Sequence, residues 1–497
     1  MLPNNGISMS RIGATPKEGN IAPRRLQLLV VLASYGMKNY QYLQHILHQY
    51  RRMPFDVKMV VVSDGPKDLP SDVSVLVGMP GANSWTLPFA HKPVFADNIQ
   101  NFDLFIYSED DIEITHESIM AFMRVQDELQ PDEIAGFLRY ELDGNGGRHF
   151  PDMHGCFHWV PESAQRRGVS VIAEFSNEHA ACYILTQAQL KKMISSGGFL
   201  RPPEEGRHDF ACTAATDPYT RCGYRKVICI SNLNEFLVHH LSNRYVGQVG
   251  LALPTVQEQI QTLMNIANGI HPARTLCNVE SKFRHRKWSK NYYEHPHNPI
   301  HSLLMDSAQK ILIIGCGLGV NELNWKQSGA EITILPLDSI VGISSSDSSI
   351  ELIFGTLAEC FANLGERRFD CVLISSLLHL QADPGQFLEL CARFVEVGGT
   401  LIVDGPNFCR FAIIINRLLG RGDYRNLGDY NQSGINPCSP RSLVKNLHKA
   451  NLQMEIISWW QEPTIGKSRW TSFKRQMGWV TAEDWIFRAR RLSSPIN

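Results

Sequence analysis

Residues 311–319 read ILIIGCGLG, an apolar stretch that runs directly into three alternating glycines. The apolar residues predict a buried parallel strand, and a helix is expected from Val320. Glycine has no Cβ, so Gly315, Gly317 and Gly319 would let backbone amides at the start of that helix approach a ligand closely. Glycine turns between a strand and a helix also occur without a ligand, so the motif alone leaves both interpretations open.

A carboxylate follows the glycines at the distance expected for a nucleoside site. The next apolar strand ends at Asp338, about 20 residues after the last glycine, an interval at which an acidic side chain reaches the ribose hydroxyls of a bound nucleotide. These two features together predict a cofactor with a nucleoside part. They do not choose between a dinucleotide and S-adenosylmethionine.

Apolar strands alternate with helical patterns on both sides of this motif. In the C-terminal half, strands are expected at 311–314, 332–335, 371–374 and 400–403, with Val397-Gly398-Gly399 as the turn into the last. In the N-terminal half, strands are expected at 26–34, 57–63 and 102–108, with a helix over 40–50. The polar, His-rich stretch 285–301 separates the two series. We therefore predict two α/β domains, 26–300 and 301–497, after a mobile tail of residues 1–25.

Three further segments follow the glycine motif in order. They are FDCVLISSLLHLQADP at 369–384, VEVGGTLIVDGPN at 395–407 and NRLLGRGDYRNLGDYNQSGINPCSPRSLVKNLHKANLQMEII at 416–457. As a set, residues 310 to about 457 resemble the class I S-adenosylmethionine-dependent methyltransferases. The last segment is similar to the small-molecule O-methyltransferases of sugars and quinones. The resemblance implies a Rossmann-like C-terminal domain that binds S-adenosylmethionine.

This resemblance implies roles for individual residues. Gly315, Gly317 and Gly319 would line the methionine and ribose parts of the cofactor, Asp338 would bind the ribose diol, Leu357 would flank the adenine, and Ser375 would lie beside the cofactor. Ile313 stands at a position that is often acidic in this family.

His379 follows the fourth expected strand of the C-terminal half. It is our candidate for the base that removes a proton from an acceptor hydroxyl, because that task needs a group that titrates near neutral pH. The alternative is a histidine that packs against the cofactor edge or caps a helix.

Three carboxylates end an apolar strand in the N-terminal half. The strand FDLFIYS at 102–108 runs into Glu109, Asp110 and Asp111. A divalent cation would neutralise this cluster, and oxygen ligands favour Mg²⁺ or Mn²⁺, which bridge diphosphates. The alternative is a solvated acidic turn at the end of a strand.

Polar residues also follow the first two strands of this half. Tyr35 and Asp64 lie at the edge where open α/β sheets bind ligands. The order ASYGMKNYQYL, VVVSDGP and FDLFIYSEDDI (33–43, 60–66 and 102–112) resembles a GT-A glycosyltransferase, whose acidic motif holds a metal ion and a nucleotide diphosphate. GFLRYE, NEHAACYILTQAQL and LVHHLSNRY (136–141, 177–190 and 237–245) are similar to a poorly characterised glycosyltransferase-like family. The resemblance spans roughly residues 26–250.

The second resemblance implies a metal and donor site. Glu109, Asp110, Asp111 and His240 would hold the cation, Asp64 would contact the nucleoside, and Tyr35 would bind the donor substrate. Adjacent histidines on a strand point to opposite faces, so at most one of His239 and His240 is expected to be a ligand. A structural pair at a strand end is the alternative.

A base is also needed to activate the acceptor of a glycosyl transfer. Asp209 is our candidate, with Asp217 second. Asp217 precedes Pro218, which favours a turn or cap role for it.

The composition limits partners and compartment. Lys and Arg total 48 against 49 Asp and Glu, a net charge of -1, so no nucleic acid partner is expected. The 12 cysteines show no zinc spacing and predict reduced thiols, and no apolar run is long enough to span a bilayer, so a cytoplasmic protein is expected. Residues 466–491 interleave basic residues with tryptophan. They are interpreted as the closing strand and helix of the methyltransferase sheet, with peripheral contact to the inner face of a membrane as the alternative.

We therefore expect a bifunctional enzyme. Its N-terminal domain would transfer a sugar from a nucleotide-sugar donor to a glycan, glycolipid or glycoside acceptor with the help of the metal ion. Its C-terminal domain would O-methylate a sugar or glycoside with S-adenosylmethionine. One alternative is a monofunctional methyltransferase whose N-terminal domain binds a glycan or nucleotide sugar without turnover. Another is a non-catalytic scaffold in which both sites are vestigial.

Overall fold

The computed structural model describes residues 24–204, 208–277, 279, 288–293, 300, 303–304, 308–317, 329–341, 350–460 and 478–493. The N-terminal part begins with a five-stranded sheet in the order β11-β4-β1-β2-β3. Its strands are β1 (Gln27–Ser34), β2 (Asp56–Ser63), β3 (Val73–Val77), β4 (Leu104–Glu109) and β11 (Cys182–Thr186), and only β11 runs antiparallel to its neighbour. The helices of this part are α1 (Tyr40–Arg51), η1 (Ser84–Ala90), α2 (His91–Asp97), α3 (His116–Gln126) and α4 (Gln187–Ser195).

The first strands could be predicted from the sequence because their residues are buried in the core. Residues 28–33 of β1 are all buried, as expected for a parallel strand covered on both faces. The strands expected at 26–34, 57–63 and 102–108 and the helix over 40–50 are therefore confirmed, with small shifts of their ends.

Two further sheets complete the N-terminal part. One has the order β6 (Glu133–Ala135), β12 (Arg225–Cys229), β10 (Ser170–Phe175), β9 (Trp159–Arg167), and the other the order β14 (Leu251–Ala252), β8 (Arg148–Phe150), β7 (Leu138–Leu142), β13 (Leu237–His240), β5 (Ile112–Glu113). The helices α5 (Phe210–Thr220), η2 (Leu233–Phe236) and α6 (Leu253–Ala267) belong to the same region. Most of these strands pair antiparallel, so the parallel α/β pattern covers only the beginning of residues 26–300.

The C-terminal part is built on one seven-stranded sheet. Its order is β17 (Ile350–Leu352), β16 (Glu331–Pro336), β15 (Lys310–Cys316), β18 (Phe369–Ile374), β19 (Val395–Pro406), β21 (Asp484–Arg491), β20 (Leu452–Trp460). The helices are α9 (Leu357–Leu364), η3 (Leu378–Leu380), α10 (Pro384–Ala392), α11 (Phe411–Leu418), η4 (Gly422–Asn426), α12 (Tyr430–Ser433), α13 (Pro440–Lys449) and α15 (Gly478–Thr481). The four expected strands of this half are confirmed, and β15 to β19 are parallel.

Two details differ from the expectation. Residues 397–399 were expected to form a turn before the strand, but they lie inside β19. Gly398 has a left-handed φ of 80°, and the register of β19 against β18 shifts at this point, so the expected turn is an irregularity within the strand. β21 closes the sheet as expected for 466–491, whereas residues 461–477 lie outside the described part.

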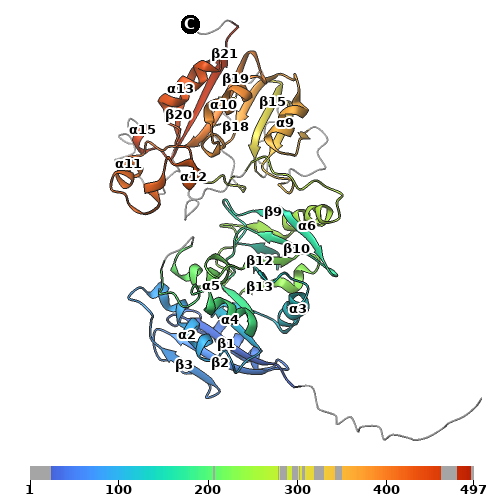
Figure 1. Cartoon of the computed structure of the whole chain (residues 1–497), viewed down its shortest axis with the longest axis vertical. Helices are drawn as coiled ribbons and strands as arrows, with labels where there is room; N and C mark the ends of the chain where they lie inside the picture. Colours follow the sequence, from blue (N-terminus) through green and yellow to red (C-terminus); the bar gives the residue numbers. More distant parts are fainter. Residues whose placement is uncertain are drawn as a thin grey trace, which may run out of the picture.

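The order of the C-terminal sheet reverses between β15 and β18, and this is the point at which open α/β sheets bind ligands. Figure 1 shows this sheet, coloured yellow to red, and the blue N-terminal sheet at opposite ends of the molecule, with β9, β10, β12 and α6 between them. No helix in the described ranges is both long enough and apolar enough to cross a membrane.

A buried ion pair joins α2 to α5. Lys92 and Asp217 are almost completely buried, and the Lys92 ammonium donates a hydrogen bond to Asp217 Oδ2. The other carboxylate oxygen, Oδ1, lies 3.0 Å from Arg221 Nε. Asp217, our second candidate for a base, is therefore a structural partner of two cations.

We expect Asp217→Ala to lower the free energy of unfolding by about 3–5 kcal/mol, because it leaves the Lys92 charge buried without a partner. Asp209→Ala is the matched control, since Asp209 is an exposed helix cap whose loss costs about 1 kcal/mol. Urea denaturation of the full chain measures both changes. Equal losses in the two variants would contradict the structural role of the Lys92–Asp217 pair.

Candidate functional site

A cavity of about 300 Å³ opens at the carboxyl ends of β1 and β4. Tyr35, Asn39, Trp85, Glu109 and Asp110 are among its lining residues. The Trp85 side chain is 56% exposed, and Tyr35 is exposed to a similar extent. The cavity therefore combines two exposed aromatic rings with two carboxyl groups.

The carboxyl groups of this region have separate partners. Asp110 accepts hydrogen bonds from Ser34 Oγ at 2.6 Å and Asn39 Nδ2 at 2.8 Å. Asp111 instead lies 3.1 Å from His240 Nε2 and accepts a second bond from Asn39. Among the described residues, no group of three or more His, Cys, Asp or Glu side chains is arranged to hold a metal ion.

Burial changes the charge of these groups. It raises the pKa of Glu109 to about 8, with a contribution from the neighbouring Asp111. Burial also raises the pKa of Asp110 to about 6, against the hydrogen bonds from Ser34 and Asn39. At neutral pH Glu109 is mostly protonated and presents a hydrogen-bond donor to the cavity. Glu109, Asp110, Asp111 and His240 therefore lie in one region without forming a three-ligand group, and the expected cation site stays a prediction.

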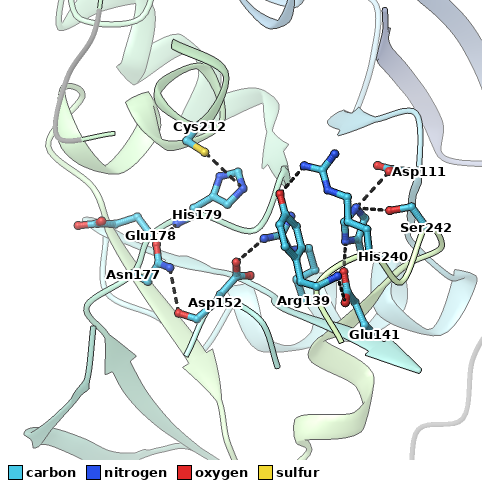
Figure 2. Close-up of polar contacts among 12 residues, drawn as sticks. Asp111, Arg139, Glu141, Asp152, Asn177, Glu178, His179, Cys212, His240 and Ser242 are labelled. Atoms are coloured by element: carbon cyan, nitrogen blue, oxygen red, sulfur yellow. Dashed lines mark hydrogen bonds and ion pairs between the residues drawn. The ribbon is translucent and has the colours of Figure 1, made fainter. Parts of the chain in front are cut away.

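His240 is the centre of a buried polar network (Figure 2). Its Nδ1 lies 2.6 Å from Glu141 Oε1, and its Nε2 lies 3.1 Å from Asp111 Oδ2 and 2.8 Å from Ser242 Oγ. Burial acts to raise the pKa of Asp111, but hydrogen bonds from His240 and Ser242 outweigh it and lower this pKa below its usual value. Both ring nitrogens of His240 thus lie within hydrogen-bond distance of a carboxylate.

The two adjacent histidines face opposite sides of β13, as expected. The ring of His239 stacks on Tyr140 with 4.9 Å between centroids, and its Nε2 lies 3.1 Å from Asn243 Oδ1.

Residues without an assigned role lie beside this network. Figure 2 shows Arg139 pointing to Asp152, with 2.6 Å between Nη2 and Oδ1, and His179 pointing to Cys212. Burial lowers the pKa of His179 and raises that of Cys212, so both are neutral at pH 7. Arg139 lies in the segment GFLRYE, whose two charged residues, Arg139 and Glu141, are both buried, and no sequence signal identified either of them.

The remaining candidates of this half serve local structure. The Asp209 carboxylate is exposed and caps α5 by accepting a hydrogen bond from the backbone N–H of Cys212 at 2.9 Å, which does not favour it as a base. Asp64 is exposed and accepts a hydrogen bond from the backbone N–H of Gly36 at 2.8 Å. It thereby orients the loop that carries Tyr35 to the cavity.

In the C-terminal half, two of the motif glycines lie where the chain packs against itself. A Cβ on Gly315 would come within 2.3 Å of Leu377 Cδ1, and the residue has a left-handed φ of 93°. A Cβ on Gly317 would come within 2.4 Å of the Tyr292 carbonyl oxygen. Glycine is therefore required at both positions by close packing. Gly319 lies outside the described residues.

Asp338 carries an unpartnered oxygen at the end of β16. It is fully buried, and its Oδ1 accepts hydrogen bonds from the backbone N–H groups of Ile340 and Val341, each at 2.9 Å. Its Oδ2 is buried and has no hydrogen-bond partner in the part of the chain that the structure describes. Burial raises the pKa of this carboxyl to about 7. An acceptor left open in this way fits a ribose hydroxyl, so this side chain suits the nucleoside part of S-adenosylmethionine.

Ser375 and His379 lie at the next strand end and both contact the segment 288–293. Ser375 Oγ accepts a hydrogen bond from the buried Lys290 ammonium at 2.8 Å. His379 Nε2 lies 2.6 Å from the Trp288 carbonyl oxygen and therefore carries the proton, which leaves Nδ1 as an acceptor. Burial lowers the pKa of His379 to about 4. This lowered pKa does not favour His379 as a base that holds a proton at neutral pH, because the ring is desolvated.

Sequence reasoning missed the residues that support this turn. Ser376 has a left-handed φ of 47°, and Asp404 accepts hydrogen bonds from its backbone N–H at 3.0 Å and its Oγ at 2.5 Å. A strained non-glycine residue held by a buried carboxylate is typical of a functional turn. Leu357 begins α9, where its backbone N–H donates to the Leu276 carbonyl oxygen at 3.2 Å.

We expect Asp338→Asn to remove a pH dependence of stability. The folded pKa of about 7 exceeds the usual 3.8, so the folded state holds an extra proton and stability falls as pH rises from about 4 through 7. Asparagine keeps the Oδ1 acceptor and stays neutral, so at pH 8 the variant should be more stable by on the order of 2–4 kcal/mol. Denaturant unfolding between pH 5 and 8 measures this. Parallel profiles for both proteins would show that Asp338 ionises normally.

Comparisons with known proteins find methyltransferases. No family model matches the chain. The chain is 26% identical over 161 residues to a ubiquinone biosynthesis O-methyltransferase of Stutzerimonas stutzeri (strain A1501), covering 28% of this chain and 69% of the relative. It is 25% identical over 187 residues to the protein of the same name from Xanthomonas oryzae pv. oryzae (strain PXO99A), covering 33% of this chain and 75% of the relative.

Among solved structures, a SAM-dependent methyltransferase from Methanosarcina mazei matches with a TM-score of 0.29 and 15% identity, covering 40% of this chain and all of that chain. The comparisons support methyltransferase activity and give no support to a GT-A domain, a nucleotide-sugar donor or glycosyl transfer. The C-terminal half has a Rossmann-like α/β fold, and over part of its length the chain is similar to O-methyltransferases.

Proposed function

We propose that the C-terminal half transfers a methyl group from S-adenosylmethionine to a hydroxyl oxygen of a small acceptor. The observation that carries the proposal is the buried, unpartnered Oδ2 of Asp338 at the end of β16, beside the point where the sheet order reverses. The likeness to O-methyltransferases supports the same chemistry.

Several residues of this chain would hold the cofactor. Asp338 Oδ2 would accept a hydrogen bond from a ribose hydroxyl, Leu357 would flank the adenine, and Ser375 would lie beside the methionine part. Backbone amides near Gly315, Gly317 and Gly319 would approach the same part. Lys290, which donates to Ser375, adds a buried positive charge there.

The bound cofactor supplies an electrophilic methyl group on a sulfonium. The acceptor hydroxyl must then be oriented toward that methyl group and must lose its proton. His379 Nδ1 has no hydrogen-bond partner within the described ranges and lies 3.8 Å from the position of a Cβ on Gly405. We infer that this nitrogen accepts a hydrogen bond from the acceptor hydroxyl. With a pKa of about 4, His379 orients the hydroxyl rather than storing its proton, which would leave to solvent water as the oxygen–methyl bond forms and the methyl–sulfur bond breaks.

The acceptor belongs to one of two chemical classes. The relatives are named for ubiquinone biosynthesis, which favours a hydroxylated ring, and the resemblance in the sequence also allows a sugar or glycoside. Both offer a hydroxyl of the kind that His379 can orient.

Asp338→Asn should weaken binding of S-adenosylmethionine at least tenfold, about 1.4 kcal/mol or more, because the amide nitrogen cannot accept the ribose hydrogen bond. Isothermal titration of the full chain measures the affinity. Asp383→Asn is the matched control, because asparagine caps α10 as well as aspartate does. A wild-type chain that does not bind S-adenosylmethionine would refute the proposal.

The N-terminal cavity favours a second candidate function, the binding of a nucleotide sugar. Trp85 and Tyr35 can stack on a base or a sugar ring, and the protonated Glu109 and the Asp110 carboxylate can bond its hydroxyls. Binding without turnover requires only these contacts. The bifunctional form would also need Mn²⁺ or Mg²⁺ at Glu109, Asp110, Asp111 and His240, and Asp209 or another base to activate the glycan, glycolipid or glycoside acceptor.

Trp85→Ala is expected to weaken binding of a nucleotide sugar by about 5- to 100-fold, since stacking of one base on an aromatic ring contributes about 1–3 kcal/mol. Titrations of UDP-, GDP- and ADP-sugars, with and without Mn²⁺, provide the measurement. The equally exposed Trp479 offers the control substitution Trp479→Ala. If no sugar nucleotide binds the wild type in either condition, the cavity has another ligand class.

A further inference from the structure

The helix α11 directs its apolar side chains away from the protein. Phe411 is 65% exposed, Leu418 is 81% exposed, and Ile414 is also exposed. Ile413, which is 4% exposed, is the residue that packs into the core. At about 100° per residue, Ile413 lies opposite Phe411 and Leu418 on the helix. The outward face is therefore apolar, the reverse of an ordinary surface helix.

Neighbouring residues extend this apolar face. Leu419, directly after the helix, is exposed, and so is Trp479 on α15. The loop before α11 holds α15 in place, because Asn407 Nδ2 donates a hydrogen bond to the Trp479 carbonyl oxygen at 3.1 Å. Figure 1 shows α11 and α15 on the same side of the C-terminal sheet. We call Phe411, Ile414, Leu418, Leu419 and Trp479 the α11 surface.

Positive charge borders the α11 surface. Arg417, Arg421 and Arg425 are exposed and follow one another through the end of α11 and η4. Arg410 also lies there but pairs with Glu483 at 3.3 Å. Residues 408–426 contain these four arginines and one acidic residue, Asp423. An apolar face bordered by arginines is complementary to an anionic lipid surface, because the apolar side chains can contact the acyl chains while the arginines contact the phosphates.

The α11 surface also begins close to the candidate methyl-transfer site. Phe408, just before α11, lies 6.0 Å from His379 and 5.5 Å from Trp288, measured between ring centroids. Three residues later Phe411 is exposed. An acceptor held at a membrane would therefore reach the sheet edge over a short path.

We propose that the α11 surface docks the C-terminal half on an anionic membrane, with Phe411, Ile414 and Leu418 among the acyl chains and Arg417, Arg421 and Arg425 at the phosphates. The proposal goes beyond methyl transfer and does not depend on it. A second copy of the chain is the competing occupant, but three arginines on each surface would repel one another in a symmetric pair.

Co-sedimentation of the full chain with vesicles tests the proposal. We expect binding to vesicles of phosphatidylcholine mixed with phosphatidylglycerol, and little binding to vesicles of phosphatidylcholine alone, because binding needs attraction to anionic lipid as well as apolar area. The variant Phe411→Ser/Leu418→Ser should bind at least tenfold more weakly. Arg421→Gln/Arg425→Gln should also bind more weakly, and raising the salt concentration should weaken wild-type binding.

Two controls keep the result specific. Val169→Ser removes an apolar side chain that is 84% exposed in the N-terminal half and should leave vesicle binding unchanged. Thermal unfolding of Phe411→Ser/Leu418→Ser should match the wild type, because both side chains are exposed. The proposal would be overturned if the wild-type protein does not bind anionic vesicles. It would also be overturned if Phe411→Ser/Leu418→Ser binds them as tightly as the wild type does. A wild-type dimer that this variant abolishes would overturn it as well. Binding of S-adenosylmethionine, measured separately, tests the methyl-transfer proposal independently.

Discussion

Each buried carboxylate at the end of a parallel strand needs a hydrogen-bond donor. The carboxyl ends of parallel strands lie at one edge of the sheet, and the sheet interior excludes water, so the donor must come from the protein or from a ligand. In this protein β4 ends at Glu109, with Asp110 and Asp111 directly after it, and Asp338 lies two residues after the end of β16. Burying a charged group without a partner costs more than folding can offset, so such groups either find donors or bind a proton. The way in which each edge meets this requirement decides what it can bind.

At the N-terminal edge, residues of the protein itself supply the hydrogen-bond donors that the carboxylates need. Ser34, Asn39 and His240 supply donors to Asp110 and Asp111, and Glu109 is protonated instead. The network therefore satisfies its own carboxylates, and the aromatic rim of the cavity is what remains to contact a ligand. This arrangement favours recognition of rings and hydroxyls.

The C-terminal edge is different because one oxygen stays open. Asp338 uses Oδ1 to order the following turn and leaves Oδ2 for another donor. The segment 288–293 packs over this edge and joins the two halves of the chain, since Tyr292 stacks on His158 at 4.3 Å between centroids and its backbone N–H donates to the Gly155 carbonyl oxygen at 2.8 Å. Lys290, on the same segment, reaches Ser375. The connection between the halves thus forms part of the proposed methyl-transfer site.

The sequence by itself determined the parallel strands of the first and last sheets and the positions of Asp338 and the acidic triplet at or just after strand ends, and the division into two domains stays a prediction. These follow from local apolar runs, because a buried strand shows in its own residues. Only the tertiary structure decided which carboxylates are neutralised, that His379 is desolvated, and that Lys290 and Arg139 are buried. Those properties depend on residues far apart in the chain, such as Asp111 and His240 or Trp288 and His379, whose contact no local pattern specifies. The outward apolar face of α11 belongs to the same class, since its helical period is visible in the sequence but the side that the core covers is not.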